Sequence, residues 1–527
     1  MLGTLRNLYL NSFLYDRRIS KSFSSSFQYK SSTYLLSSIV KNHSKKININ
    51  ELDFDSIWTN TNLNQKQFKK LNNFFWIFSL DLKSSSSSVQ KVIKNWIEIN
   101  QKYTKDSWEF DTTSKRIISW LSNSKLTYDD GSQEYRDNFN FIIQKQIYHI
   151  LNQIKNLRNY DDKLIGVVAI ILFSLSYKDQ EKLLSIGLDY LKKIIKNSLD
   201  KFGFPKSRNI QQIIFYLKHL ILLREWFKES QTSIPEFVDE YIFYLGQSYN
   251  FFWKNINFHP LFNGNNVSEN DEFNHYLKRL GYSFKNENHE HSNYVYLQNK
   301  KINLFMDVGP SPDKNFSHTY QAGALSFELA SNGKKIFTNS GFYNAKNIEL
   351  SKLSRSSAVH NTLIIDDNSS CKFKKNSNNK FIIKNDLKII KRDVIFEKNY
   401  WKIVAAHDGY LKKYNLVFER EIEFYPESFR MIGKDKIIGR KNLPSLKFEI
   451  RFHLHPSSKI LKTQDNKSIL IEIEDEGWKF SCKNYEIHID NGLYFGKKNT
   501  YSENQNIFIS GIISSKHTNI EWELIKI

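Results

Sequence analysis

The chain has 527 residues, 40% of them hydrophobic and 25% charged. At about 100–200 residues per domain this length excludes a single small module, and the hydrophobic content excludes a disordered chain. Lys and Arg number 76 against 55 Asp and Glu, a formal net charge of +21 that favours a polyanionic partner. The lysines are scattered and form no basic block, which argues against nucleic acid. An A+T-rich genome would impose the same bias toward Lys, Asn and Ile without selection on charge.

Two cysteines, Cys371 and Cys482, exclude a disulfide framework. The first 18 residues contain no continuous apolar region, so we expect no conventional signal peptide. The longest apolar run, residues 164–174, is shorter than the ~18–20 residues that a membrane span needs. We therefore expect a buried helix at that position and a soluble protein.

The first half of the chain shows helical periodicity. We interpret residues 1–60 as an N-terminal extension and 61–285 as a helical domain, with a loop at the serine run 84–88. The apolar spacing predicts helices over 65–82, 89–101, 114–122, 136–158, 164–174, about 183–195, 210–228 and 235–254. Helices of this length joined by short polar loops predict an array of helical hairpins.

The periodicity changes to two after residue 293, and the residues 259–292 between are rich in Pro, Gly, Asn and His. We place the domain boundary there, with a second domain over 290–527. About a dozen short apolar strands follow, separated by turn residues such as Asn332-Gly333 and Asp408-Gly409. Strands without intervening helices predict an antiparallel β-sandwich.

Polar and titratable residues are densest between Asp307 and Asp367. His318 lies in a predicted loop, Asn339 follows one strand and His360 precedes another. If these ends converge at one sheet edge, they would form a metal or acid/base pocket. The alternative is that a histidine beside an asparagine in a turn is a hydrogen-bonded structural residue.

Three motifs in this stretch resemble the heparinase II/III-like polysaccharide lyases, and in particular their uncharacterised bacterial branch. They are SHTYQAGALSFE (317–328), TNSGFY (338–343) and RSSAVHNTLIID (355–366). HDGY (407–410) and RFHLHP (451–456) also match, whereas the helical half shows a fainter likeness at 108–120, 207–209 and 261–264. The resemblance covers roughly the last 230 residues, with one offset: the family's first His falls on Thr319, next to His318.

The resemblance implies an α+β multidomain fold, in which an incomplete (α/α) toroid precedes an antiparallel β-sandwich. It also implies β-elimination on a uronate-containing polysaccharide, in which the carboxylate is neutralised and a Tyr or His moves each proton. A bacterial cell-envelope location follows from the family, although without a recognisable signal peptide a cytoplasmic location stays open.

Metal-bearing members of the family hold a structural zinc with His, Asp and His. Here Gln321 and Asn339 replace two of these ligands and Gly323 replaces a neighbouring Asp, so that only His360 remains. Neutral amides are poor zinc ligands. We therefore expect no metal and no other cofactor, although His318 could shift into a ligand role.

The candidate catalytic residues are His360, Tyr320 and Tyr410, and the candidate substrate-binding residues are Arg355, Arg208, Asn209, His318 and Asn361. Each has a structural alternative. His360 could only order its loop, and Arg355 could form a surface salt bridge instead of gripping a uronate. The tyrosines could only pack, and Asn209 could cap a helix. Asn265 and Asn266 are further candidates for neutralising the carboxylate.

Two functions agree with these residues. The first is a polysaccharide lyase that cleaves an acidic glycan. The second is a catalytically silent protein that binds such a glycan and keeps the lyase fold. The hypothesis that the protein binds nucleic acid is based on its charge alone. The identity of the glycan, endo or exo action and the oligomeric state stay open.

Overall fold

The computed structural model describes residues 2–21, 25–38, 40, 58, 63–80, 85–253, 258–267, 271–377, 379–439, 445–513 and 515–527. The chain divides into two compact units. The helical unit comprises residues 1–198, 216–242 and 271–282, and the sheet unit comprises 199–215, 243–270 and 283–527. The predicted boundaries at 60, 285 and 290 stay a prediction, and most of the second half of the predicted N-terminal extension lies outside the described residues.

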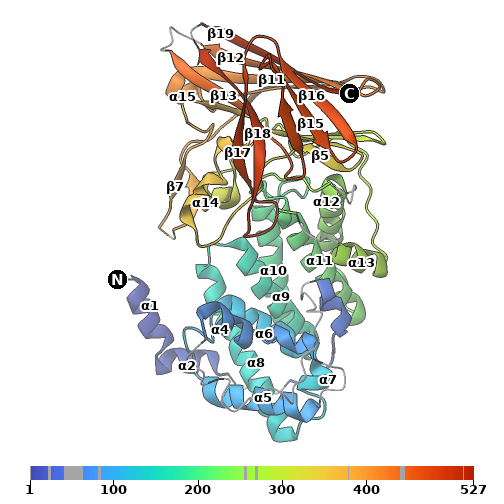
Figure 1. The fold of residues 1–527 in the computed structure, drawn as a ribbon. Helices are drawn as coiled ribbons and strands as arrows, with labels where there is room; N and C mark the ends of the chain where they lie inside the picture. The colour runs from blue at the N-terminus through green and yellow to red at the C-terminus, as the bar shows by residue number, and fades with distance from the viewer. Residues whose placement is uncertain are drawn as a thin grey trace. The chain divides into compact units, whose positions relative to one another are not determined.

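Helices fill the first half of the chain, drawn blue to green in Figure 1. They are α1 (Leu2–Leu10), α2 (Phe13–Ile19), η1 (Thr33–Ser38), α4 (Gln65–Asn72), η3 (Phe75–Ser79), α5 (Ser86–Asn100), α6 (Phe110–Ser122), α7 (Ser124–Thr127), α8 (Gln133–Gln153), η4 (Ile154–Asn156), α9 (Tyr160–Ser176), α10 (Glu181–Ser198), α11 (Gln211–Glu229), α12 (Glu236–Trp253) and α13 (Asp271–Arg279). The apolar helix α9 packs against α6 and α10, and its residues from Leu164 onward are buried. No described helix is long and apolar enough to cross a membrane.

One predicted helix is interrupted. Residues 65–82 were expected to form a single helix, but α4 ends at Asn72, and Phe74 adopts a left-handed conformation with φ 57° before η3. The turn places the fully buried Phe74 ring against Trp96 and Trp120, and the Asn73 side chain accepts a hydrogen bond from the Phe75 amide. Aromatic burial therefore outweighs the helical periodicity here.

Arg116 on α6 organises the core of this unit. Its side chain is fully buried and donates to Gln146 Oε1 and to the carbonyl oxygens of Asn72 and Ser107 at 2.9 Å each. The guanidinium carbon lies 4.0 Å from the centre of the Trp96 ring. These contacts satisfy a buried charge that would otherwise be costly.

The sheet unit contains four antiparallel sheets in its described residues. Their strand orders are β1-β2-β3-β4-β5, β14-β15-β16-β19-β12-β11-β10-β9, β17-β18-β13-β6 and β7-β8. The strands are β1 (Glu290–His291), β2 (Tyr294–Gln298), β3 (Ile302–Asp307), β4 (Phe327–Ser331), β5 (Lys334–Phe337), β6 (Leu363–Ile365), β7 (Phe373–Lys375), β8 (Phe381–Ile383), β9 (Ile389–Phe396), β10 (Trp401–His407), β11 (Leu416–Tyr425), β12 (Arg430–Gly439), β13 (Leu446–His453), β14 (Lys459–Lys462), β15 (Ser468–Ile473), β16 (Glu476–Cys482), β17 (Ile487–Tyr494), β18 (Ser502–Ile513) and β19 (His517–Lys526).

Alternation along the strands builds the sandwich core. Along β12 every second residue from Met431 to Gly439 is buried, which is the period-two pattern of a sheet with one covered face. One continuous apolar cluster joins the sheets, and it includes Phe327, Phe452 and Trp522. The red strands β17 and β18 lie side by side in Figure 1 and pair in register from Ile487 to Tyr494.

Two segments far from the strands in sequence also belong to the sheet unit. The last turns of α12 bring Phe252 against Tyr294 of β2 and Phe305 of β3, with ring centres 5.2 and 5.5 Å apart. The loop after α12 is anchored by Asn266, whose side chain donates to the carbonyl oxygens of Phe342 and Phe495. These segments bring polar residues from before residue 270 to the edge of the first sheet.

Candidate functional site

The three matched motifs meet in the sheet unit. They lie on η5 (Lys314–Thr319) and the loop into β4, on the loop after β5, and on the segment that follows α14 (Ile348–Leu353) through η6 (Ser357–Val359) into β6. The Ala322 amide donates to Arg355 O at 2.9 Å and the Ser340 amide to Val359 O at 3.0 Å. These backbone hydrogen bonds join segments 33 and 19 residues apart in the sequence into one layer, here called the His360 layer.

His360 is buried at the end of η6 with one ring nitrogen free. Nδ1 lies 2.8 Å from Ser356 O, and because a carbonyl only accepts, Nδ1 carries the proton. Nε2 has no hydrogen-bond partner among the described residues. Burial lowers the pKa of His360 to about 4, so the ring is neutral at pH 7 and its free nitrogen holds a lone pair. The ring packs on Gly323, where a Cβ would lie 2.6 Å from Cδ2.

Tyr320 is the second buried group with a free polar atom. Its side chain is 1% exposed, and its hydroxyl lies beside the buried Cys371 thiol without a nitrogen or oxygen partner in the described part of the chain. Burial raises the pKa of Tyr320 well above its usual value, so the hydroxyl keeps its proton at neutral pH. The residue can therefore give a proton to a ligand but does not supply a phenolate.

Arg355 is a buried cation without a carboxylate partner in the described residues. It donates to Ser351 O and Oγ at 2.5 and 2.9 Å and to His318 O at 3.0 Å, and its Nε atom has no partner there. Burial lowers its pKa to about 10, so the side chain stays charged at pH 7. The guanidinium carbon also lies 4.7 and 5.1 Å from the centres of the Phe342 and Phe381 rings, which offsets part of the cost of burial. An anionic ligand would supply the opposite charge that these contacts lack.

Arg208 and Asn209 reach the same region from the segment before α11. Arg208 has φ 61° and forms a buried ion pair with Asp307 at 2.7 Å, while its guanidinium stacks 4.6 Å from the centre of the Tyr294 ring. Asn209 Oδ1 accepts from the Gln211 amide at 2.9 Å, which is the capping contact of the structural alternative. Its Nδ2 donates to Thr319 Oγ1 at 3.2 Å, beside Tyr320.

The remaining predicted residues are engaged with the protein. Asn361 donates from Nδ2 to Phe327 O at 2.7 Å and accepts at Oδ1 from the His453 amide. The Tyr410 hydroxyl donates to Leu363 O at 2.6 Å. His318 is partly buried, and burial, Lys380 and Arg355 lower its pKa to about 4. The roles predicted for all eight residues stay predictions.

The residues at the zinc-ligand positions of the family do not fit a metal. Gln321 Oε1 accepts from the Gly264 amide at 3.0 Å, and its Nε2 donates to Gly341 O at 2.9 Å and Ser354 O at 2.6 Å. Asn339 Oδ1 accepts from the Asn361 amide at 3.1 Å. Both side-chain oxygens therefore accept from backbone amides, while Asn339 Nδ2 has no partner in the described part of the chain. Within the described ranges no three His, Cys, Asp or Glu side chains are arranged to hold an ion.

Two buried ion pairs that the sequence analysis did not single out support the layer. Glu328 is fully buried and accepts from Lys335 Nζ at 2.9 Å and from the amides of Asn339 and Leu261. Arg420 and Asp435 form a doubly hydrogen-bonded pair at 2.6 and 2.9 Å. Charged residues inside apolar strands are the sequence signal that could have found both pairs.

The C-terminal part of the chain matches a known protein family. Residues 285–523 match the family model "Heparinase II/III-like, C-terminal". Over these residues the predicted resemblance to the heparinase II/III-like family is confirmed. No curated protein matches the sequence.

Solved structures with the same fold cover most of the chain. The heparinase III BT4657 gene product superposes with a TM-score of 0.67 at 14% identity, covering 89% of this chain and 79% of its own. Heparan sulfate lyase HepC from Pedobacter heparinus gives 0.66 at 12%, covering 94% and 87%. A second heparinase III gives 0.67 at 15%, covering 97% and 88%. The predicted fold class, a helical toroid followed by an antiparallel β-sandwich, is confirmed.

Proposed function

We propose that the protein is a polysaccharide lyase that cleaves an acidic, uronate-containing glycan by β-elimination. The observation that carries this proposal is the state of three buried groups on the matched motifs. His360 is neutral with a free lone pair, Tyr320 is protonated with a free hydroxyl, and Arg355 is charged without a carboxylate partner in the described residues. These are a base, an acid and a cation, which an elimination on a uronate requires.

The reaction would proceed as follows. The uronate carboxylate pairs with the Arg355 guanidinium, and the Asn209 amide gives a further hydrogen bond, so that the C5 proton becomes more acidic. His360 Nε2 takes that proton, the bond between C4 and the glycosidic oxygen breaks, and a C4–C5 double bond forms. The Tyr320 hydroxyl protonates the departing oxygen. Proton exchange with water then restores the neutral imidazole and the phenol.

The proposed substrate class agrees with an acidic polysaccharide as the binding partner and with the cell envelope as the location. A uronate polymer is a polyanion and complements the net charge of +21. We infer that nucleic acid is not the partner, because the basic residues are spread along the whole chain. We also infer a bacterial cell-envelope location, which suits a polymeric glycan.

One observation favours a second candidate function, a catalytically silent glycan-binding protein. The side chains of His360 and Tyr320 are each 1% exposed, so a polymer reaches them only if the surrounding loops open. If the loops stay closed, the protein would bind the glycan at its basic surface without cleaving it.

Incubation with a panel of uronate-containing polysaccharides distinguishes the two functions. A lyase produces unsaturated uronate ends, seen as new ultraviolet absorbance. His360→Ala should lower the rate by about 10²-fold or more, because one proton-transfer group is lost. His517→Ala, at an exposed position on β19, should leave the rate unchanged and serves as the matched control.

Circular dichroism and thermal unfolding of both variants establish that they fold. Full activity in a folded His360→Ala protein would remove His360 from the mechanism. Binding of an acidic glycan without any new absorbance would select the silent function.

A further inference from the structure

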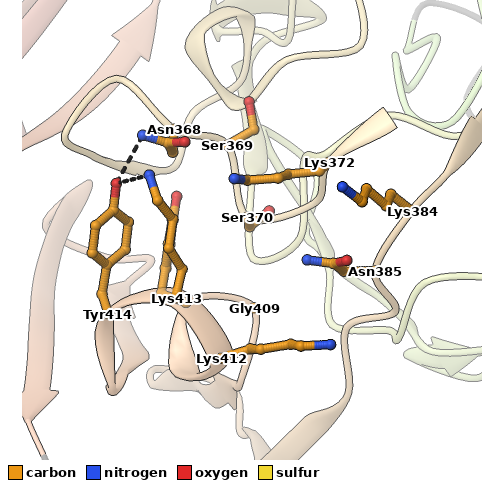
Figure 2. A pocket seen from close by; sticks show the side chains of 11 residues that line it. Asn368, Ser369, Ser370, Lys372, Lys384, Asn385, Gly409, Lys412, Lys413 and Tyr414 are labelled. Carbon is orange, nitrogen blue, oxygen red and sulfur yellow. Dashed lines mark hydrogen bonds between the residues drawn. The ribbon is translucent and has the colours of Figure 1, made fainter. Parts of the chain in front are cut away.

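A basic pocket lies in the sheet unit between the loop after β6, the loop after β8 and the connection from β10 to β11. Its volume is about 380 Å³. The lining residues, most of them labelled in Figure 2, are Asn368, Ser369, Ser370, Lys372, Lys384, Asn385, Gly409, Tyr410, Lys412, Lys413 and Tyr414. Cavities that hold small ligands begin at about 300 Å³, so the pocket is large enough for one or two sugar residues.

Positive charge dominates this pocket. Four of its lining residues are lysines, all exposed, and no carboxylate is among the lining residues. Figure 2 shows the side chains of Lys372 and Lys384 on one side of the pocket and Lys412 on another. The neighbouring Asp408 accepts from the Lys388 amide at 2.7 Å, and Asp366 accepts from the Tyr414 hydroxyl at 3.3 Å. Four like charges around one hollow repel each other, and an anion between them would relieve the repulsion.

The floor of the pocket is rigid and polar. A Cβ at Gly409 would lie 2.7 Å from Ser370 O and 2.8 Å from Leu387 Cδ1, so only glycine fits there. The Tyr414 hydroxyl is held by Asn368 Nδ2 at 2.8 Å and Lys413 Nζ at 2.5 Å, as Figure 2 shows. Two tyrosine rings and several amide and hydroxyl groups thus surround the charges, a combination suited to a hydroxylated anion and not to a bare ion.

We propose that this basic pocket is a second glycan-binding site, which holds a carboxylate or sulfate group of an acidic polysaccharide. It adjoins the His360 layer, because its lining residues Ser369 and Ser370 are hydrogen-bonded to Ser357 at 2.9 and 3.1 Å. The proposal rests on the proposed function for the identity of the polymer. His360, Tyr320 and Arg355 do not line the pocket. Tyr410 does, but its hydroxyl donates to Leu363 O, so we assign binding and not catalysis to the pocket. Its role is to hold a second part of the same chain and thereby raise the overall affinity.

Matched charge variants test the site. The pocket variant carries Lys372→Gln, Lys384→Gln and Lys412→Gln. The control variant carries Lys479→Gln, Lys483→Gln and Lys516→Gln, which are exposed lysines outside the pocket. Both variants lose three positive charges, so a difference in their glycan affinity depends on where the lysines lie and not on the net charge. Both are made in the full chain with His360→Ala, so that the glycan is not consumed.

The probes are heparin, which carries sulfate and carboxylate groups, hyaluronan, which carries carboxylates only, and a DNA duplex. The Kd of the pocket variant for heparin, hyaluronan or both should be about tenfold or more higher than that of the His360→Ala protein. The Kd of the control variant should rise by no more than about twofold. Loss confined to heparin identifies a sulfate site, and equal loss for hyaluronan identifies a carboxylate site.

Equal effects of the two variants on glycan binding, or no glycan binding at all, would overturn the proposal, as would loss of DNA binding alone. The outcome is separable from that of the proposed function. Pocket-dependent binding, together with no unsaturated product from the unmodified protein that keeps His360, would refute the lyase and keep the site. Unsaturated product with no difference between the two variants would keep the lyase and refute the site.

Discussion

Buried histidines define the chemistry of this protein at the scale of single residues. Burial lowers the pKa of His149, His407 and His453 to about 3 and that of His291, His318, His360 and His455 to about 4. Each is neutral in the folded state at pH 7. The same burial that makes His360 a base without a proton also makes stability depend on pH.

We predict that stability falls as the pH decreases from 6.5 to 4.5. An unfolded histidine binds a proton below its ordinary pKa of about 6.5, whereas the buried rings bind one only near pH 4 or 3, so protons favour the unfolded state. The free energy of unfolding should fall by up to about 1.4 kcal/mol per pH unit for each such histidine. Urea unfolding followed by tryptophan fluorescence measures this slope.

His453→Gln is the informative variant for that slope. His453 Nε2 lies 2.9 Å from Ala358 O, and a glutamine amide can donate in its place without titrating. The free energy of unfolding of the variant should change less with pH, and the difference in slope should equal the contribution of one histidine. Stability that stays constant or rises between pH 6.5 and 4.5 would contradict the burial of neutral rings.

The sequence could predict residue types at the site but not all of their contacts. His360 and Arg355 were found because they lie in ordered motifs within a short stretch. The pairing of Arg208 with Asp307 joins residues 99 positions apart and depends on the packing of the loop before α11, which periodicity does not describe. The amide contacts of Gln321 likewise depend on where Gly264 lies.

At the scale of elements, buried side-chain amides join the matched motifs. Gln321 joins its own loop to the segments at Gly264, Gly341 and Ser354, and Asn361 joins β4 to β13. Both of these amides are buried and hydrogen-bonded, so neither offers a vacant ligand atom to an ion.

The purified protein should therefore contain no stoichiometric zinc, as the replacement of two ligands by amides predicts. Elemental analysis of the full chain measures the zinc content. Unfolding temperature with and without a chelator gives an independent readout, and we expect no shift. One zinc per chain, or a chelator-induced loss of stability, would show that His360 and its neighbours bind metal.

The strands could be predicted from the sequence because their period-two pattern is strong. The basic pocket could not be predicted from the sequence. Its lysines come from two loops and the short helix α15 (Leu411–Tyr414) in a chain with 76 Lys and Arg, so nothing in the sequence marks these four. The break between α4 and η3 was missed for a related reason, since the burial of Phe74 is decided by aromatic neighbours from α5 and α6.

At the scale of the whole molecule, the change of period near residue 290 predicted a helical part followed by a sandwich, and the comparisons confirm that fold. What periodicity could not predict is that residues 199–215 and 243–270 group with the strands. These segments supply Arg208, Asn209 and Asn263, whose side chain donates to Asp307 at 2.9 Å. The candidate site is thus assembled from both halves of the sequence.

The measurement that tests the central claim most directly is cleavage of an acidic polysaccharide in water enriched in oxygen-18, followed by mass spectrometry of the products. Elimination adds no water, so each cleavage should yield one unsaturated uronate end, and neither new end should carry the heavy isotope. Products that are each saturated, with one atom of oxygen-18 incorporated per cleavage, would show hydrolysis and contradict the account.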